Sequence, residues 1–309
     1  MTCPIFLAGK WENSPVIKYF ELYPNRCIAG YARSVSHCRK HSFLIICRFL
    51  QNGFPCVLTV YDRVKGGVYL HRQEERYVMK KVLGSGATAC VYLVYDRLLE
   101  RNLALKRGKE KSLLRQEAKL LAGFSTPFFP TLYEYTEQED VSLLFMEYIE
   151  GENLSERKKR IECFTEEEAL GIGVEIAKAL VCLHTGTSPY VYGDLKPENI
   201  MVRADGSLKL IDFGAAVPID REGKKCVGEK RGGTPLYAPP EQWMGRPDVR
   251  NDIYALGRLL QDMLKMGRGG TLSRGSRRLI ERCVQKQPEK RYPSMEALLE
   301  EAKALLKNL

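Results

Sequence analysis

Two short polar motifs constrain this chain more than any other feature of its sequence. The first is Tyr-Gly-Asp-Leu-Lys-Pro-Glu-Asn at positions 192–199, and the second is Ile-Asp-Phe-Gly at positions 211–214. They bring the carboxylates of Asp194 and Asp212 and the amide of Asn199 into one short stretch. The motifs therefore indicate a site of chemistry.

A glycine-containing turn precedes these motifs. The segment Gly-Ser-Gly-Ala-Thr-Ala-Cys-Val at 84–91 lies between two predicted strands, where its small residues would let backbone amides close over a phosphate chain. It departs from G-x-G-x-x-G at Ala89, and by itself it indicates only a hairpin. Lys106 follows at the end of the apolar run 104–106, where a strand would point it into a cleft. Glu117, on the next predicted helix, could supply the partner that a desolvated lysine needs.

The motifs at 192–199 and 211–214 resemble the catalytic loop and the D-F-G magnesium loop of the protein kinases. Phosphoryl transfer requires a carboxylate near the acceptor hydroxyl, oxygen ligands for magnesium, and cations on the phosphates. The resemblance implies ATP with Mg²⁺, or Mn²⁺, as cofactors, and metal ligation by Asn199 and Asp212. The catalytic set that it implies is Asp194, Lys196, Lys106, Glu117 and Thr234.

Three segments further along the chain resemble the same family. Gly-Thr-Pro-Leu-Tyr-Ala-Pro-Pro-Glu at 233–241 looks like the end of a kinase activation segment. Asp-Ile-Tyr-Ala-Leu-Gly at 252–257 looks like the central helix whose aspartate holds the catalytic loop, and Arg291 stands where kinases place the arginine that pairs with Glu241. The resemblance covers residues 76–309, and these features look most like the bacterial, eukaryotic-like serine/threonine kinases.

The same resemblance implies a nucleotide site. The segment 144–151 is similar to the hinge between two lobes, with Met146 beside the adenine pocket and the backbone of Glu147 and Ile149 as adenine contacts. For Val91, Ala104 and Met201, plain core packing would explain the residues equally well. The implied nucleotide set is Leu83, Gly84, Ser85, Gly86, Val91, Ala104, Lys106, Met146, Glu147, Ile149 and Met201.

The pattern of apolar residues, together with the resemblance, predicts an α+β, two-lobed protein-kinase fold. An N-lobe at about 76–146 would be a small antiparallel sheet with one helix at 112–123. A mainly helical C-lobe would follow at about 152–309. Within it, Thr165 with Glu168 three residues later is the pattern of a capping box and predicts the start of a helix.

Residues 1–75 give a weaker signal, and we treat them as an N-terminal extension of unknown function. Two β-prone runs, 43–50 and 56–61, flank the turn Asn52-Gly53 and predict a hairpin. Cys38-x-x-His41 in the same segment has a separation suited to zinc, but no second pair of this kind accompanies it. Free thiols are therefore the favoured interpretation of these cysteines.

Composition bounds the class of protein. The chain has 309 residues and a formal net charge of +10, which suits anionic partners, but no recognised nucleic-acid motif accompanies the charge. No apolar run approaches the ~20 residues of a membrane helix, including at the end of the chain, and no signal peptide is evident. We therefore expect a cytoplasmic protein whose partners are ATP and proteins bearing Ser or Thr, with its oligomeric state open.

Two departures from the family pattern concern regulation and docking. Gly193 replaces the arginine of H-R-D, which in other kinases helps to bind a phosphate on the activation loop, and residues 215–233 contain no Ser, Thr or Tyr. These two features predict a non-RD enzyme that activation-loop phosphorylation does not control. Thr234 and Lys196 point to Ser or Thr acceptors. The short stretch 258–282 also predicts a truncated substrate-docking region.

Two alternatives to a serine/threonine protein kinase remain open. Gly193-Asp194 is similar to the H-G-D loop of aminoglycoside phosphotransferases, which act on small molecules, although the segments at 196–199 and 234–241 follow the protein-kinase pattern. A catalytically inactive pseudokinase that senses nucleotide is the alternative from another class. It conflicts with the presence of every side chain that the transfer requires.

Overall fold

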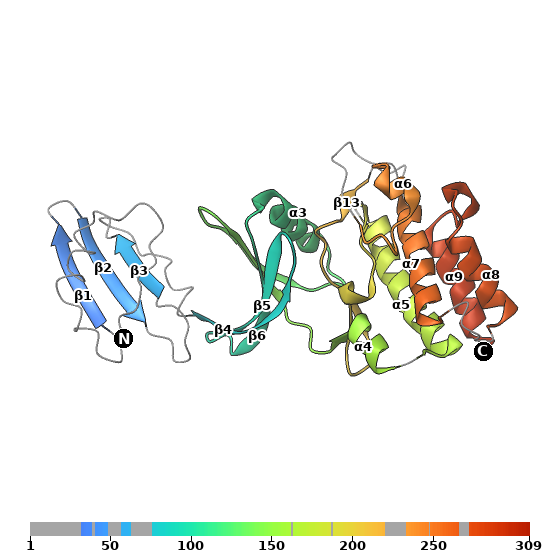
Figure 1. Ribbon diagram of the computed structural model, residues 1–309, viewed down its shortest axis with the longest axis horizontal. Helices are drawn as coiled ribbons and strands as arrows, with labels where there is room; N and C mark the ends of the chain where they lie inside the picture. Colours follow the sequence, from blue (N-terminus) through green and yellow to red (C-terminus); the bar gives the residue numbers. More distant parts are fainter. Residues whose placement is uncertain are drawn as a thin grey trace. The chain divides into compact units, whose positions relative to one another are not determined.

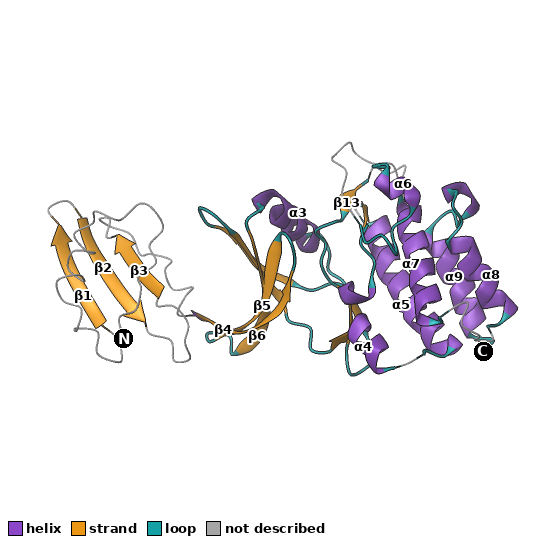
Figure 2. Cartoon of the chain, in the orientation of Figure 1, coloured by secondary structure: helices purple, strands orange, loops and turns teal. Residues whose placement is uncertain are grey.

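The structure of the chain is a computed structural model that describes residues 32–38, 41–48, 57–62, 76–161, 163–186, 188–219, 233–246, 248–265 and 272–309. The chain divides into two units, residues 1–72 and residues 73–309, and each is described by itself. Figure 1 shows the elements along the chain, and Figure 2 distinguishes helices from strands.

The first unit contains a three-stranded antiparallel sheet in the order β1-β2-β3, with strands at Ala32–Cys38, His41–Arg48 and Val57–Asp62. The sequence analysis assigned β2 and β3 to a hairpin, whereas it did not identify β1. The turn Asn52-Gly53 lies outside the described residues. The side chains of Cys38 and His41, on which the zinc alternative depends, lie outside them as well.

The N-terminal lobe of the second unit is a five-stranded antiparallel sheet in the order β4-β5-β6-β8-β7. Its strands are β4 Tyr77–Ser85, β5 Ala89–Asp96, β6 Arg101–Gly108, β7 Leu132–Glu137 and β8 Ser142–Glu147. Successive side chains of a strand point to opposite faces. Leu103 and Leu105 are therefore buried on one face of β6, while Ala104 and Lys106 face the helix α3 and the second lobe.

The helix α3, at Lys111–Ala122, packs on this second face of the sheet and confirms the helix predicted at 112–123. Its apolar residues recur at spacings of three and four, which places them on one side of the helix. The glutamate of the expected Lys–Glu pair lies among them, so packing of the helix carries that carboxylate into the lobe. The buried residues are Leu114, Glu117, Ala118, Leu120 and Leu121.

The C-terminal lobe is mainly helical, and the structure therefore confirms the α+β, two-lobed fold. Its helices are α4 Leu154–Arg160, α5 Glu166–Thr185, α6 Pro240–Trp243, α7 Val249–Met263, α8 Arg274–Cys283 and α9 Met295–Leu306. Its short strands are β9 Glu152–Asn153, β10 Tyr190–Val191, β11 Ile200–Val202, β12 Leu208–Leu210 and β13 Val217–Pro218. Short 3₁₀ helices occupy Pro197–Asn199 and Pro288–Lys290.

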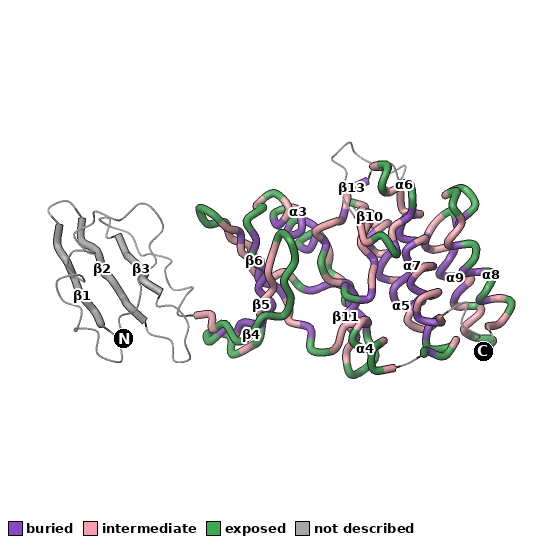
Figure 3. The backbone as a smooth tube through the Cα atoms, viewed as in Figure 1, coloured by how far each residue is buried: buried purple, intermediate pink, exposed green. Residues whose placement is uncertain are grey.

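The helix α5 begins with the predicted capping box. The Thr165 hydroxyl accepts the Glu168 amide at 3.1 Å, and the Glu168 carboxylate accepts the Thr165 amide at 2.9 Å. These bonds satisfy amides that the first turn of a helix leaves without partners. α5 then packs against α7 and α9 at the centre of the lobe, where Figure 3 shows the buried backbone. The loops after β10 and β12 rest on this frame.

The segment between α7 and α8 is short, as the sequence indicates. It spans residues 264–273, of which 266–271 lie outside the described residues. None of the helices in the described part of the chain has both the length and the apolar character that crossing a membrane would require.

Candidate active site

Lys106 on β6 lies between two carboxylates. Its ammonium donates to Glu117 Oε2 at 2.6 Å and to Asp212 Oδ1 at 2.9 Å. Glu117 comes from α3 and Asp212 from the segment after β12, so three elements meet at this amine. The Lys106 side chain is only 9% exposed and that of Glu117 only 1%. Charges this deeply buried require close partners, and each has one here.

The charges of this cluster shift the pKa values of Lys106 and Asp212. Burial lowers the pKa of Lys106, but the carboxylates of Glu117 and Asp212 raise it more, and the net pKa lies above its ordinary value. Burial raises the pKa of Asp212, whereas the Lys106 ammonium lowers it, and the net pKa lies below its ordinary value. At neutral pH the cluster therefore presents a protonated amine and an ionised carboxylate.

A second cluster surrounds Asp194, in the loop after β10. Lys196 Nζ donates to its Oδ2 at 2.6 Å, and Thr234 Oγ1 donates to its Oδ1 at 2.8 Å. The side-chain amide of Asn199 donates to the backbone carbonyl of Asp194 at 2.9 Å and to its Oδ2 at 3.1 Å. The structure thus brings Asp194, Lys196, Asn199 and Thr234 together, although Thr234 comes from a distant segment of the chain.

The carboxylate of Asp252, in the first turn of α7, holds the loop that carries Asp194. It accepts the amides of Tyr192 and Gly193 at 2.7 and 2.9 Å, and His184 Nε2 lies 2.8 Å from its Oδ2. Gly193 has a φ of +77°, which glycine adopts without the steric cost that a side chain would add. Asp212 has a φ of +62°. Positive φ values are uncommon for residues other than glycine and occur often at functional sites.

The two clusters are neighbours. The Ile211 amide donates to the Asn199 carbonyl at 2.9 Å, and the Tyr192 hydroxyl donates to the Ile211 carbonyl. The rings of Tyr192 and Phe213 meet edge to face, with centroids 5.4 Å apart. Leu121 of α3 is buried in the same apolar cluster as these two rings. This packing fixes the segment that carries Asp212 against the loop that carries Asp194.

The residues expected around an adenine ring lie on neighbouring strands. Ala104 on β6 stands opposite Met146 on β8, and both are buried. Val91 lies on β5 and packs against the same apolar cluster. Ile149 is buried just after β8, and Met201 lies half-buried on β11 in the other lobe. Apolar packing alone accounts for these positions, so their contact with a nucleotide is a proposal.

The glycine turn ends β4. Leu83, Gly84 and Ser85 are its last residues, and Leu83 is 39% exposed. The Gly86 amide donates to the Ala89 carbonyl at 2.9 Å, which closes a tight turn before β5. Together these contacts form the hairpin that the sequence indicates. The closure of its amides over a phosphate remains a prediction.

The side chain of Glu147 has contacts that the sequence did not indicate. The sequence analysis assigned only its backbone to the nucleotide site. Its carboxylate accepts Lys209 Nζ at 2.8 Å, the Thr131 amide at 3.2 Å, and a bond from Arg203. Burial raises the pKa of Glu147, but Lys209, Thr131 and Arg203 lower it below its ordinary value. This ionised carboxylate therefore ties the end of β8 to β11 and β12.

The segment 233–246 is anchored to the C-terminal lobe. Arg291 pairs with Glu241 at 2.5 Å, and the arginine side chain is 0% exposed. The Tyr237 hydroxyl donates to Asp262 Oδ2 at 2.6 Å. The sequence suggested the Arg291–Glu241 pair, but nothing in it pointed to Asp262. Residues far apart in the chain meet here, and no local pattern reports such contacts.

The donor set of Asn199 and Asp212 fits a magnesium ion, which prefers oxygen ligands and often takes only one or two from the protein. Among the described residues, no group of three or more His, Cys, Asp or Glu side chains could hold a metal ion. A site with two protein ligands is compatible with an ion that also binds substrate phosphates.

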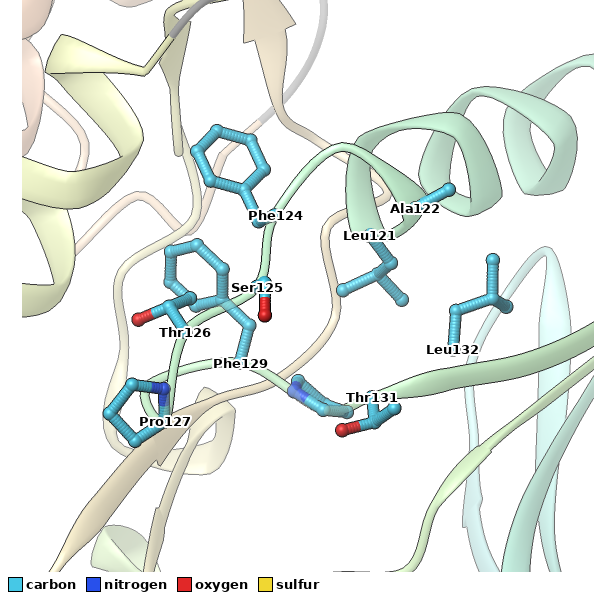
Figure 4. Close-up of a pocket in the computed structure, with 10 residues that line it drawn as sticks. Leu121, Ala122, Phe124, Ser125, Thr126, Pro127, Phe129, Thr131 and Leu132 are labelled. Carbon is cyan, nitrogen blue, oxygen red and sulfur yellow. The ribbon is translucent and has the colours of Figure 1, made fainter.

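The structure also contains a cavity of about 510 Å³ (Figure 4). It is formed by the connection from α3 to β7, with lining residues from Leu121 to Leu132 that include the rings of Phe124 and Phe129. None of the described side chains of the two charged clusters is among its lining residues. The lining of this cavity therefore supplies none of the charged groups on which the candidate chemistry rests.

Two lobes, a lysine paired with a helix glutamate, and an aspartate loop held by a central helix define a protein-kinase architecture. The sequence matches the model of the protein kinase domain over residues 77–268, more than half of the chain. The chain therefore belongs to the protein kinase domain family.

Curated relatives agree with this membership. A protein of Clostridium perfringens named as a probable serine/threonine-protein kinase is 30% identical over 197 residues, covering 61% of this chain. The kinase PrkC of Bacillus subtilis is 29% identical over 61% of this chain, and PknG of Mycolicibacterium smegmatis is 28% identical over 76% of it. The matches span only 28%, 30% and 33% of these relatives' own lengths.

Proposed function

We propose that this chain transfers the γ-phosphate of ATP to Ser or Thr hydroxyls of protein substrates. The observation that carries the proposal is the meeting of Lys106, Asp194, Lys196, Asn199 and Asp212 in two adjacent clusters with their expected partners. The names of the curated relatives support the same acceptor class.

In the proposed reaction the substrate hydroxyl oxygen bonds to the γ-phosphorus, the bond from that phosphorus to the bridging oxygen breaks, and ADP leaves. Asp194 would accept the hydroxyl proton, and Lys196 beside it would stabilise the charge on the transferred group. Lys106 would bind the ATP phosphates. Asn199 and Asp212 would hold the magnesium ion, which neutralises phosphate charge when it is bound.

Lys106→Ala should abolish detectable transfer, because it removes the ammonium that we propose to bind the ATP phosphates. The measurement is incorporation of phosphate from radiolabelled ATP into a generic basic protein, followed by phosphoamino-acid analysis. Lys80→Ala is the matched control, since Lys80 is exposed and contacts Asn102 and the Tyr95 ring on the surface of the sheet. Equal transfer by both variants would contradict the assignment of Lys106.

The same assay separates the two alternatives. A wild-type protein that binds ATP but transfers nothing would favour the nucleotide-sensing pseudokinase. Phosphate that appears on aminoglycosides or sugars and never on protein would favour the small-molecule kinase.

We also infer that activation-loop phosphorylation does not control activity. Gly193 supplies no cation for a loop phosphate, and residues 215–233 supply no hydroxyl to carry one. Thr234 already donates its hydroxyl to Asp194, which suits a positioning contact better than a phosphosite. Phosphatase-treated enzyme, repurified and assayed beside a mock-treated sample, should keep its activity. A large loss that returns on autophosphorylation would contradict this inference.

A further inference from the structure

The side chain of Gln242 reaches from α6 to the loop that carries Asp194. Its amide Nε2 donates to the Gly193 carbonyl at 2.7 Å. Gly193 is the residue immediately before Asp194, and it stands where the H-R-D pattern has an arginine. Neither the proposed chemistry nor the family match gives Gln242 a role.

With this bond, both backbone polar groups of Gly193 have a side-chain partner. The Gly193 amide donates to Asp252 Oδ1 of α7 at 2.9 Å, and the Gly193 carbonyl accepts the Gln242 amide of α6. A peptide unit held at its carbonyl cannot rotate freely about the backbone bonds that set the direction of the next side chain. Gln242 therefore restrains the backbone from which the Asp194 carboxylate projects.

Gln242 is itself held in place. The backbone amide of Gln242 donates to the Pro239 carbonyl at 3.1 Å, and the adjacent Glu241 is paired with the buried Arg291. Its side chain passes over Gly233, where a Cβ would come within 2.5 Å of Nε2. The absence of a side chain at Gly233 is therefore a condition for the Gln242 contact.

We propose that Gln242 is a positioning residue that locks the segment 233–246 to the loop that carries Asp194 without a phosphate. This proposal rests on the proposed kinase activity. It explains how the loop that carries Asp194 is held in place although position 193 is glycine and not the arginine of the H-R-D pattern. Two contacts join the segment to the loop: the Gln242 amide donates to the Gly193 carbonyl, and the Thr234 hydroxyl donates to the Asp194 carboxylate. Neither contact requires a charge to be added or removed.

Gln242→Met tests the proposal, because methionine keeps the length of the side chain and removes the donor. The single-turnover rate of phosphoryl transfer should fall about 10-fold, the effect of a lost hydrogen bond to a partly buried carbonyl. Gln242→Glu should lose more, since its ionised carboxylate faces that carbonyl without a proton to donate. ATP affinity should be unchanged in both variants, because the bond that they change is made to Gly193, which does not belong to the nucleotide set.

Gln285→Met is the matched control. Gln285 makes the same kind of bond, from its side-chain amide to the Glu281 carbonyl at 2.9 Å, at the end of α8. Its main-chain carbonyl accepts Arg291 Nε, and the substitution leaves this main-chain bond in place. The control should transfer phosphate at the wild-type rate. Gly233→Ala provides an independent variant, because its Cβ would displace the Gln242 amide, and its loss should be smaller when Gln242 is already methionine.

The outcomes separate this inference from the activity on which it rests. An inactive wild-type protein would overturn the proposed function. An active wild-type protein with Gln242→Met at the same single-turnover rate would overturn the role of Gln242 alone. A rate loss shared with Gln285→Met, or a fall in ATP affinity equal to the fall in rate, would also overturn it, since a general structural defect would then explain the result.

Discussion

Asp194→Asn is expected to lower the rate of phosphoryl transfer by about 10²–10⁴-fold, the range that general acid–base groups contribute. Asparagine has the shape of aspartate and can still accept the Thr234 hydroxyl at its carbonyl oxygen. It cannot take up the proton of a substrate hydroxyl. The measurement is single-turnover transfer to a protein substrate, with ATP affinity measured by calorimetry on the same preparation.

The specific prediction is that rate falls while affinity stays constant. Asp205→Asn is the control, because Asp205 caps an exposed turn between β11 and β12 through the Ser207 amide and lies outside both charged clusters. It should leave both quantities unchanged. Transfer by Asp194→Asn near the wild-type rate would remove Asp194 from the proposed reaction.

Arg291→Met should destabilise the C-terminal lobe by about 3–5 kcal/mol, the cost of breaking a buried ion pair by removing one partner. Arg291 donates to both carboxylate oxygens of Glu241 and to the carbonyls of Arg250, Gln285 and Lys286. Methionine fills a similar volume but leaves Glu241 and these carbonyls without their donor. Chemical denaturation followed by circular dichroism measures the change in the free energy of unfolding.

Arg282→Met is the comparison for this stability effect. Arg282 is exposed, lies 3.9 Å from Glu301 and has its guanidinium 4.2 Å from the centre of the Tyr292 ring, and exposed contacts of these two kinds each contribute about 1 kcal/mol or less. Its loss should therefore change the free energy of unfolding by less than the loss of Arg291. If both variants unfold at the same denaturant concentration as the wild-type protein, the buried pair does not stabilise the lobe. Arg291→Met should also slow transfer, because Glu241 adjoins Gln242.

Local patterns in the sequence predicted much of the fold. Apolar residues at spacings of three and four placed α3, and Glu117 lay on its buried side because it shares that spacing with Leu114 and Leu121. Alternation along β6 placed Lys106 and Ala104 on one face. The Thr165–Glu168 capping box marked the start of α5. Each of these patterns involves residues only a few positions apart, so it can be recognised in a single sequence.

The sequence by itself determined which side chains are available for phosphoryl transfer, and its motifs indicated which of them should meet. Only the tertiary structure decided how they are held. The bond from Gln242 to Gly193 and the pairing of Glu147 with Lys209 each join segments with no common pattern. Such contacts depend on how whole elements pack against one another, because the free energy of a long-range pair is set by the final arrangement and not by the spacing of residues along the chain.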